Sequence, residues 1–385
     1  MKLNHIYKSI ACGVVLAMTA TSCDLDYNPV DTYSDVTEGV NKTDEKPIFN
    51  SVQDVETSMV TLHKKFRDQQ EHWYVDKLLI GDAHSDNAYA GTTGAEVVPY
   101  ETNSIEGSNS VLKRDWDRFL GDIAVANRII VGCDQLKALS ESERGKYQSQ
   151  AKIFRALVMF DMVRLWGNFP VITTVGGDIT EDNVEEMYPT YFPPQNTAEE
   201  AYAQIEKDLT EAVENPNTPT NDTSDKSILT KSVARAMLAK VYAEKPLRDY
   251  AKVIKYADEL AADGFDLVED FSDLWAYDTE KKDCRVRNTK EAILEAHFPP
   301  GSGNWCTWMF GRNLSNWDES FTWAKWITPS RDLIRLYEEQ GDTKRYNESV
   351  VWYDCGWSNY YPADHYAFMY KCRSAFNSIS YLRYA

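Results

Sequence analysis

Apolar residues recur at every third or fourth position in several long segments, the spacing that places them on one face of an α-helix. Residues 115–133 follow this pattern. Residues 150–170 follow it as far as Gly167, Asn168 and Pro170, which are typical of a helix end. The predicted inner faces are Trp116, Phe119, Leu120, Ile123, Ala126 and Ile130 in the first segment, and Ala156, Met159, Phe160, Val163 and Trp166 in the second.

Two further helices are predicted together with their first residues. Thr197 is followed three positions later by Glu200, which is a capping-box pattern and predicts a helix through residue 213. Thr230 is the predicted cap of a helix that runs to about residue 245. Between 237 and 265 small and large side chains alternate, as in the helix hairpins of tetratricopeptide repeats; these are Ala239, Ala243, Ala251 and Ala257 with Tyr242, Tyr250 and Tyr256.

The pattern changes after residue 290. Residues 290–298 alternate in hydrophobicity, which predicts a strand with one apolar side, made of Ala292, Leu294, Ala296 and Phe298. Beyond residue 300 the chain is rich in predicted loop, apart from a helical pattern in 328–342. The predicted fold class is therefore mainly α, with tetratricopeptide-like helix pairs that carry an irregular, loop-rich lobe with a few short strands.

The N-terminal residues are predicted to be a leader and a tether. Residues 1–22 combine Lys2 and Lys8 with an apolar run at 10–18, which is too short to span a bilayer and typical of a signal peptide. The following "ATSC" resembles a bacterial lipobox, which predicts lipidation of Cys23, and the acidic "CDLD" resembles a Bacteroidetes surface-export signal. Residues 23–50 are predicted to be a polar tether, and 51–385 a single domain.

Composition and charge narrow the function classes. The 385 residues are 43% hydrophobic and 26% charged, as in an ordinary globular protein, but the net charge is −19. This charge argues against binding to nucleic acid and suits neutral or cationic ligands. Beyond Cys23 the chain has five cysteines without a C-x-x-C motif, so no zinc site is expected and no disulfide pairing can be assigned; they are Cys133, Cys284, Cys306, Cys355 and Cys372.

Motifs for catalysis, nucleotide binding and metal binding are missing from the sequence. His63 and His72 are predicted to be surface residues. The best carboxylate pair is Asp82 and Asp86, which a helix would place on one face, where they could act as acid and base or hold a cation. The alternatives are that they bond within the loop after a helix, or that they contact a polar ligand together with Asn87 and Tyr89.

Tryptophans are crowded into the predicted loops. Seven of the eleven in the chain lie between 305 and 357, among glycine, asparagine and acidic residues. Aromatic rings can stack on the apolar faces of sugars, while Asp, Asn and Arg satisfy sugar hydroxyls. We expect two or three of these tryptophans to contact a ligand and the others to pack inside the lobe.

Several segments, in this order, resemble the SusD/RagB family of surface glycan-binding lipoproteins. The most specific are "RALVMFDMVRLWGNFPVIT" and "LTKSVARAMLAKVY". The others are the lipobox region, "WDRFLGDIAVANRII", "AYAQIEKDLTEAV", "NTKEAILEAHF" and "ITPSRDLIRLYEEQGDTKRYNESVV". Together they extend over essentially the whole chain after the leader.

The resemblance implies a SusD-like α/α superhelix in which the irregular lobe forms the ligand surface. It implies a protein without catalytic activity or cofactor, which captures oligosaccharides and delivers them to a SusC-like TonB-dependent transporter in the outer membrane. Lids for peptides or another nutrient, and a glycoside hydrolase that uses Asp82 and Asp86, are the alternative functions. The expected ligand-binding residues are Trp73, Tyr74, Asp82, Asp86, Asn87, Tyr89, Trp305, Trp308, Arg312 and Trp317.

The last residues resemble the start of a longer block. The ending "ISYLRYA" is similar to a family segment that continues into further helices. The resemblance therefore implies a domain truncated at its C-terminal end, with apolar helix faces left exposed and a tendency to aggregate.

Overall fold

The computed structural model describes residues 47–90, 95–177, 179, 183–278, 280, 283–298, 326–354, 360–362, 364–373 and 378–385. They belong to one compact unit that begins at Pro47. The predicted leader, Cys23 and most of the predicted tether lie outside the described residues. Phe49, which falls within the predicted tether, is buried in the main core, and the domain division remains a prediction.

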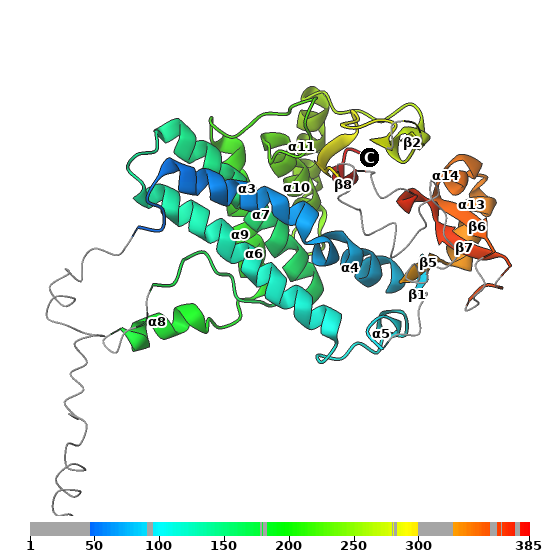
Figure 1. Ribbon diagram of the computed structural model, residues 1–385, viewed down its shortest axis with the longest axis horizontal. Coiled ribbons are helices and arrows are strands. Elements are labelled where there is room, and N and C mark those ends of the chain that lie inside the picture. Colours follow the sequence, from blue (N-terminus) through cyan, green and yellow to red (C-terminus); the bar gives the residue numbers. More distant parts are fainter. Residues whose placement is uncertain are drawn as a thin grey trace, which may run out of the picture. The chain divides into compact units, whose positions relative to one another are not determined.

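The helical body consists of long helices that pack in sequence order. Each contacts the next: α3 on α6, α6 on α7, α7 on α9, α9 on α10, and α10 on α11 (Figure 1). This arrangement confirms the predicted class of mainly helical, paired architecture. The helices are α3 (Val52–Asp68), α6 (Ser110–Gln135), α7 (Glu141–Trp166), α9 (Ala198–Glu214), α10 (Lys231–Ala243) and α11 (Tyr250–Ala262).

Helix α7 lies at the centre of the body, and most of its residues after Gln148 are buried. It begins at Glu141, nine residues before the predicted start, because Ser140 and Glu143 form a capping box that the apolar pattern did not reveal. It ends where predicted, at Gly167, whose φ of 71° is a backbone conformation that glycine adopts easily.

The predicted caps of α9 and α10 are confirmed. Thr197 and Glu200 form both bonds of the capping box, and the Thr230 side chain accepts a hydrogen bond from the Val233 backbone. Between α10 and α11 the rings of Tyr242 and Tyr256 lie parallel, with centres 6.1 Å apart. Tyr250, which belongs to the same predicted pattern, is exposed instead.

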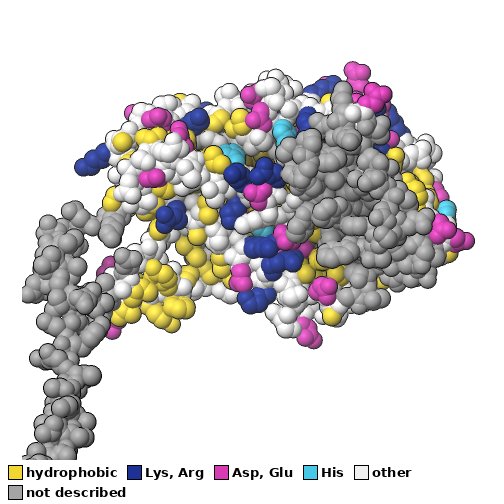
Figure 2. Space-filling model, viewed as in Figure 1, with side chains coloured by type: hydrophobic (Ala, Val, Ile, Leu, Met, Phe, Trp, Pro, Cys, Tyr) yellow, Lys and Arg dark blue, Asp and Glu magenta, His cyan; other side chains and the backbone are white. Residues whose placement is uncertain are grey.

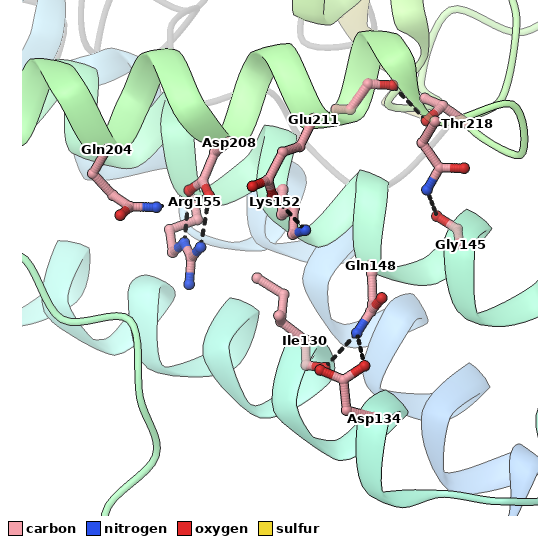
Figure 3. Close-up of polar contacts among 12 residues, drawn as sticks. Ile130, Asp134, Gly145, Gln148, Lys152, Arg155, Gln204, Asp208, Glu211 and Thr218 are labelled. Carbon is pink, nitrogen blue, oxygen red and sulfur yellow. Dashed lines mark hydrogen bonds and ion pairs between the residues drawn. The ribbon is translucent and has the colours of Figure 1, made fainter.

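A buried ion pair joins three helices of the body. Arg155 on α7 donates two hydrogen bonds to the Asp208 carboxylate on α9, at 2.7 and 2.8 Å (Figure 3). It donates a third to Asn127 on α6, at 2.7 Å, and Asn127 in turn donates to the backbone of Ile172. The charges are almost fully buried, so their pairing fixes how these helices fit together.

The lobe has its own small core. Strand β1 (Ala88–Ala90) pairs antiparallel with β5 (Ile327–Pro329), and β6 (Val350–Tyr353) pairs with β7 (Tyr366–Met369). Helices α13 (Arg331–Gln340) and α14 (Thr343–Ser349) connect β5 to β6. The core residues are Ile334, Val350, Tyr361, Tyr366, Ala367 and Phe368.

Strand β4 (Ala292–Ala296) confirms the predicted strand but not its one-sided pattern, because all five residues are buried. It pairs with β8 (Ile379–Arg383) and also contacts α10, so both of its sides are covered. The other elements are η2 (Glu71–Val75), α4 (Asp76–Leu78), η3 (Leu79–Ala83), α5 (Val98–Glu101), α8 (Val184–Tyr191), η4 (Phe271–Leu274), β2 (Tyr277–Asp278), β3 (Asp283–Cys284) and η6 (Tyr370–Cys372).

Among the described residues, no helix combines the length and the apolar character needed to cross a bilayer. The same residues contain no group of three or more His, Cys, Asp or Glu side chains placed to hold a metal ion. Cys133 has a free thiol that is buried in α6, and burial raises its pKa to about 12.

Candidate functional site

The predicted polar residues 82–87 lie in a turn between the helical body and the lobe. Helical structure ends at Ala83, so Asp82 and Asp86 do not share a helix face as the spacing predicted. The carbonyl of Asp82 accepts hydrogen bonds from the backbone and side chain of Ser85. The backbone N–H of Asn87 donates to the Ser85 hydroxyl at 3.3 Å, and the side chains of Asp86 and Asn87 are exposed.

The first residues of α13 hold this turn in place. Ser330 donates its backbone N–H to the Asn87 carbonyl, at 3.0 Å, and its hydroxyl to the Asp86 carbonyl. Both carbonyls are therefore tied to the lobe while both side chains face solvent. Because this backbone is fixed, the exposed carboxylate of Asp86 and amide of Asn87 lose less conformational entropy when they bind a ligand.

An aromatic pair lies beside the turn. The rings of Tyr89 and Tyr360 stack with centres 4.3 Å apart and planes 19° from parallel. Tyr360 donates its hydroxyl hydrogen to Glu101, and the Tyr89 hydroxyl accepts from the Arg331 backbone at 3.2 Å. Burial, together with the bond to Glu101, raises the pKa of Tyr360, which keeps its phenol protonated at neutral pH.

The two tryptophans of the crowded region that the structure describes are packing residues. Trp352 is half-buried, with His365 stacked on it at 4.2 Å and its indole N–H bonded to the Tyr346 hydroxyl. Trp326 packs partly buried against the main core. The predicted ligand residues Trp305, Trp308, Arg312 and Trp317 lie outside the described residues, so their role remains a prediction.

Trp73 and Tyr74 occupy a different place from the turn. They lie in the helical segment η2 and not in a loop, and Trp73 is only 1% exposed. Its indole N–H donates to Asp122 on α6, at 3.1 Å. Both residues contribute to the wall of a cavity of about 370 Å³ between the body and the lobe, so only a ligand that enters this cavity could reach them.

The cavity wall combines aromatic rings with cations. The ammonium group of Lys77 lies 4.8 Å from the Trp73 ring centre and pairs with Asp161, and that of Lys371 lies 4.9 Å from the Trp275 ring centre. Lys240 also lines the cavity, and its pKa is lowered by burial and by the nearby positive charges of Arg164 and Lys77.

The predicted surface position of His72 is wrong. Its side chain is fully buried, and Nε2 lies 2.8 Å from the Asp122 carboxylate. Burial lowers the pKa of His72, and the partner carboxylate only partly offsets this. His63 is half-buried and bonded to Gln150 at 3.0 Å, so it is not a freely exposed residue either.

The electrostatics around Asp82 bear on the hydrolase hypothesis. Burial raises the pKa of Asp82, and the positive charge of Lys371 acts in the opposite direction. A raised pKa suits a general acid, but such an enzyme also needs a second carboxyl across the scissile bond, about 5–10 Å away. Neither Asp82 nor Asp86 lines the 370 Å³ cavity or the larger one beside α3.

Sequence reasoning missed the residues that hold the turn, namely Ser330, Arg331 and Tyr360. Ser330 has a local signal, because it precedes a helical pattern as an N-cap would, and its side chain accepts from Leu333. Nothing in the sequence connects it with Asp86 and Asn87, which lie far away along the chain.

Residues 32–243 match a family of SusD-like proteins described as "Starch-binding associating with outer membrane". The match spans more than half of the chain. The chain belongs to the SusD-like family.

Individual relatives agree with this assignment. A SusD-like protein of Bacteroides ovatus is 26% identical over 238 residues, which is 59% of this chain but 39% of that relative. Among solved structures, a laminarin-binding SusD-like protein superposes with a TM-score of 0.66 at 19% identity, over 87% of this chain and 78% of its own. Surface glycan-binding protein A from Bacteroides thetaiotaomicron, in complex with laminarihexaose, gives 0.66 at 14% identity, over 86% and 76%.

At 14–19% identity, the solved structures establish the fold of this chain. The ligands named for them are ligands of those proteins. The chain spans well under half of the curated relative that it matches and about three quarters of the two structures.

Proposed function

We propose that this SusD-like protein is a cell-surface lipoprotein that binds an oligosaccharide without catalysis and delivers it to a SusC-like TonB-dependent transporter. The observation that carries the proposal is the turn at 82–87, where two exposed polar side chains on a fixed backbone lie beside a stacked aromatic pair. Sugars need such a combination, because each ring has polar edges and apolar faces.

In this proposal Asp86 and Asn87 bond sugar hydroxyls directly, and Asp82 lies four and five positions before them at the end of the preceding helical segment. Tyr89 and Tyr360 supply aromatic surface next to them. Trp305, Trp308, Trp317 and Arg312 add further stacking surfaces and a donor. Trp73 and Tyr74 contact the ligand only if part of it enters the cavity between the body and the lobe.

The comparisons support a glycan as the ligand class. The matched family is described as starch-binding, and two similar structures belong to a laminarin-binding protein and to a complex with laminarihexaose. A few stacked rings and hydrogen bonds on an open surface support dissociation constants on the order of micromolar or weaker. Lipidation of Cys23 would hold the protein at the outer membrane, where the transporter lies.

Native affinity electrophoresis tests the glycan proposal. The purified chain is run through gels that contain starch, laminarin or other polysaccharides, beside Asn87→Ala, Trp305→Ala, Trp308→Ala and Trp317→Ala. Tyr250→Ala is the control, because it removes an exposed aromatic side chain on α11. We expect one polysaccharide to retard the wild type and the control, with retardation reduced at least several-fold in Asn87→Ala.

Two results would contradict the proposal in different ways. If a folded wild type is not retarded by any polysaccharide, the ligand is a peptide or another nutrient. If a polysaccharide is shortened during the run and Asp82→Asn abolishes the shortening, the protein is a glycoside hydrolase.

A further inference from the structure

Exposed apolar side chains are concentrated in helix α8 and in the residues next to it. Eleven large apolar side chains are exposed among the described residues, and five of them lie between 179 and 192. They are Ile179, Val184, Tyr188, Tyr191 and Phe192. Figure 2 shows hydrophobic side chains gathered over the place that α8 occupies in Figure 1.

Three of these residues form one continuous stripe. Val184, Tyr188 and Phe192 are four positions apart, so they lie on one side of the helix, and they are 43%, 58% and 66% exposed. The rings of Tyr188 and Phe192 stack on each other with centres 4.8 Å apart. We call these three residues the α8 stripe.

Tyr191 is seven positions after Val184, so it lies next to the α8 stripe, and it is held by the chain itself. The Tyr191 hydroxyl donates to the Gly177 carbonyl at 2.7 Å, and the Tyr191 ring lies so close to Gly176 that a Cβ there would approach it to 3.0 Å. None of the residues of α8 is buried. An eight-residue helix with an internal proline is marginal alone, so the contact of Tyr191 with Gly176 and Gly177 anchors it. The three residues of the α8 stripe stay exposed beside this contact.

The charge around the stripe indicates what could cover it. Between Arg164 and Lys207 the sequence has no basic residue, whereas five acidic residues lie within 178–186. Glu185 and Glu186 are both exposed; Glu185 is next to the stripe, and Glu186 lies farther around the helix. An anionic membrane surface or a second copy of the same acidic segment would be repelled. A protein groove with apolar walls and a basic rim fits both features.

We propose that the α8 stripe and its acidic border are the surface by which this protein docks on the extracellular side of its outer-membrane transporter. The inference rests on the proposed function, because the transporter is the partner that the delivery of ligand requires. Exposed aromatic residues at the centre of a polar border are the arrangement found in protein interfaces, where Tyr and Phe are enriched. The surface is separate from the turn at 82–87, so docking and glycan binding can be changed independently.

The test compares two pairs of exposed apolar residues that have the same spacing. Tyr188→Ser/Phe192→Ser removes the α8 stripe. Tyr250→Ser/Ile254→Ser on α11 removes a pair of similar exposure, 58% and 62%, and is the control. A third variant, Glu185→Lys/Glu186→Lys, reverses the charge of the border. Each tagged full chain is expressed in the native host and purified from detergent-solubilised outer membranes, and the co-purified transporter is quantified by mass spectrometry.

We expect wild type and the α11 control to retain the transporter, and the α8 double variant to retain at least tenfold less. The charge-reversed variant should also retain less, and all four proteins should keep the same retardation in polysaccharide gels. Equal transporter recovery with the α8 variant would overturn the docking surface while leaving glycan binding in place. Loss of retardation in every protein, wild type included, would instead contradict the proposed function.

Two further experiments test whether a lipid surface or a second copy of the chain covers the α8 stripe instead of the transporter. Flotation of the wild type with vesicles of phosphatidylethanolamine and phosphatidylglycerol at 3:1, abolished in the α8 variant, would assign the stripe to lipid and overturn the proposal. A wild-type dimer in light scattering that becomes a monomer in the α8 variant would assign it to a second copy, with the same consequence. A wild type that binds glycan but recovers no transporter would overturn both the docking surface and the delivery step.

Discussion

In the helical body, the buried charges of Arg155 and Asp208 are paired with each other between α7 and α9. In the lobe, buried tyrosines pack with their rings inside, while the polar side chains of the neighbouring turn face solvent. These two charges are therefore committed to the stability of the body. The lobe keeps Asp86 and Asn87 available, which is what a binding surface needs.

The two regions also differ in the size of their cores. The main core extends from α3 to α11 and includes β4 and β8, whereas the lobe core contains six buried residues. A small core is expected to open locally at a lower free energy than a large one. Damage to the body should therefore unfold the whole protein, while damage to the lobe should remain local.

The largest effect is expected from a cavity in the body. Phe154→Ala on α7 should lower the free energy of unfolding by about 3–5 kcal/mol, because the ring is fully buried between neighbouring aromatic residues. Phe368→Ala, an equally buried ring in the lobe, is the matched comparison. Hydrogen exchange should report fast exchange throughout the chain for the first variant and only in the lobe for the second. Uniform exchange in both would show that the lobe is not a separate unit.

The second effect separates buried from exposed charges. Asp208→Ala leaves the Arg155 guanidinium buried and unpaired, which should cost about 3 kcal/mol or more. Asp117→Ala breaks the exposed pair with Lys113 and should change stability by about 1 kcal/mol or less. Urea denaturation measures both. Similar losses in the two variants would mean that the buried pair does not fix the helices.

The third prediction concerns pH. Burial and the nearby Asp76 carboxylate raise the pKa of Asp115 on α6 to about 9, while Arg114 acts in the opposite direction. In the unfolded chain this carboxyl ionises near its ordinary pKa of 3.8, so between about pH 4 and 9 only the unfolded state loses the proton. Stability should therefore fall as pH rises through this window.

Asp115→Asn removes this proton linkage while keeping the size of the side chain. Its melting temperature should exceed that of the wild type by an amount that grows from pH 5 to pH 8. Asp117→Asn, two residues along on the exposed side of α6, is the control and should show no such trend. A difference that is constant with pH would contradict the raised pKa of Asp115.

The smallest effect is expected from Tyr360→Phe in the lobe. It removes the hydroxyl that donates to Glu101 and leaves the ring stacked on Tyr89, so the loss of stability should be about 1 kcal/mol. Polysaccharide retardation should stay unchanged, because the aromatic surface is kept. Thermal denaturation and affinity electrophoresis check the two parts separately, and lost retardation would show that the hydroxyl itself contacts the glycan.

The body could be predicted from the sequence because its signals are local. The 3.6-residue period of α6 and α7 and the Thr197–Glu200 capping box each lie within a few turns of one helix. The segment 71–83 gave no such signal, because its residues are buried against partners that are distant along the chain. His72 is an example: its partner Asp122 could be named only once α6 was placed beside it.

The site could be predicted only in part, for the same reason. The polar run at 82–87 and Tyr89 were recognised from composition. The four-residue spacing of Asp82 and Asp86 suggested that both lie on one helix, but the helical segment ends at Ala83. The contacts that fix the turn come from Ser330 and Tyr360, which belong to the other end of the chain. Trp352 shows that composition also suggests too many ligand residues. Composition cannot distinguish a tryptophan that stacks on a sugar from one that packs against His365.

The most direct test of the central claim is a calorimetric titration of the full chain with an oligosaccharide from the polysaccharide that retards it. The pair to compare is Asn87→Ala at the turn and Tyr250→Ala on the body. We expect micromolar or weaker binding for wild type and Tyr250→Ala, and a dissociation constant at least fivefold higher for Asn87→Ala. Equal affinities for all three proteins would contradict the placement of the glycan site at this turn.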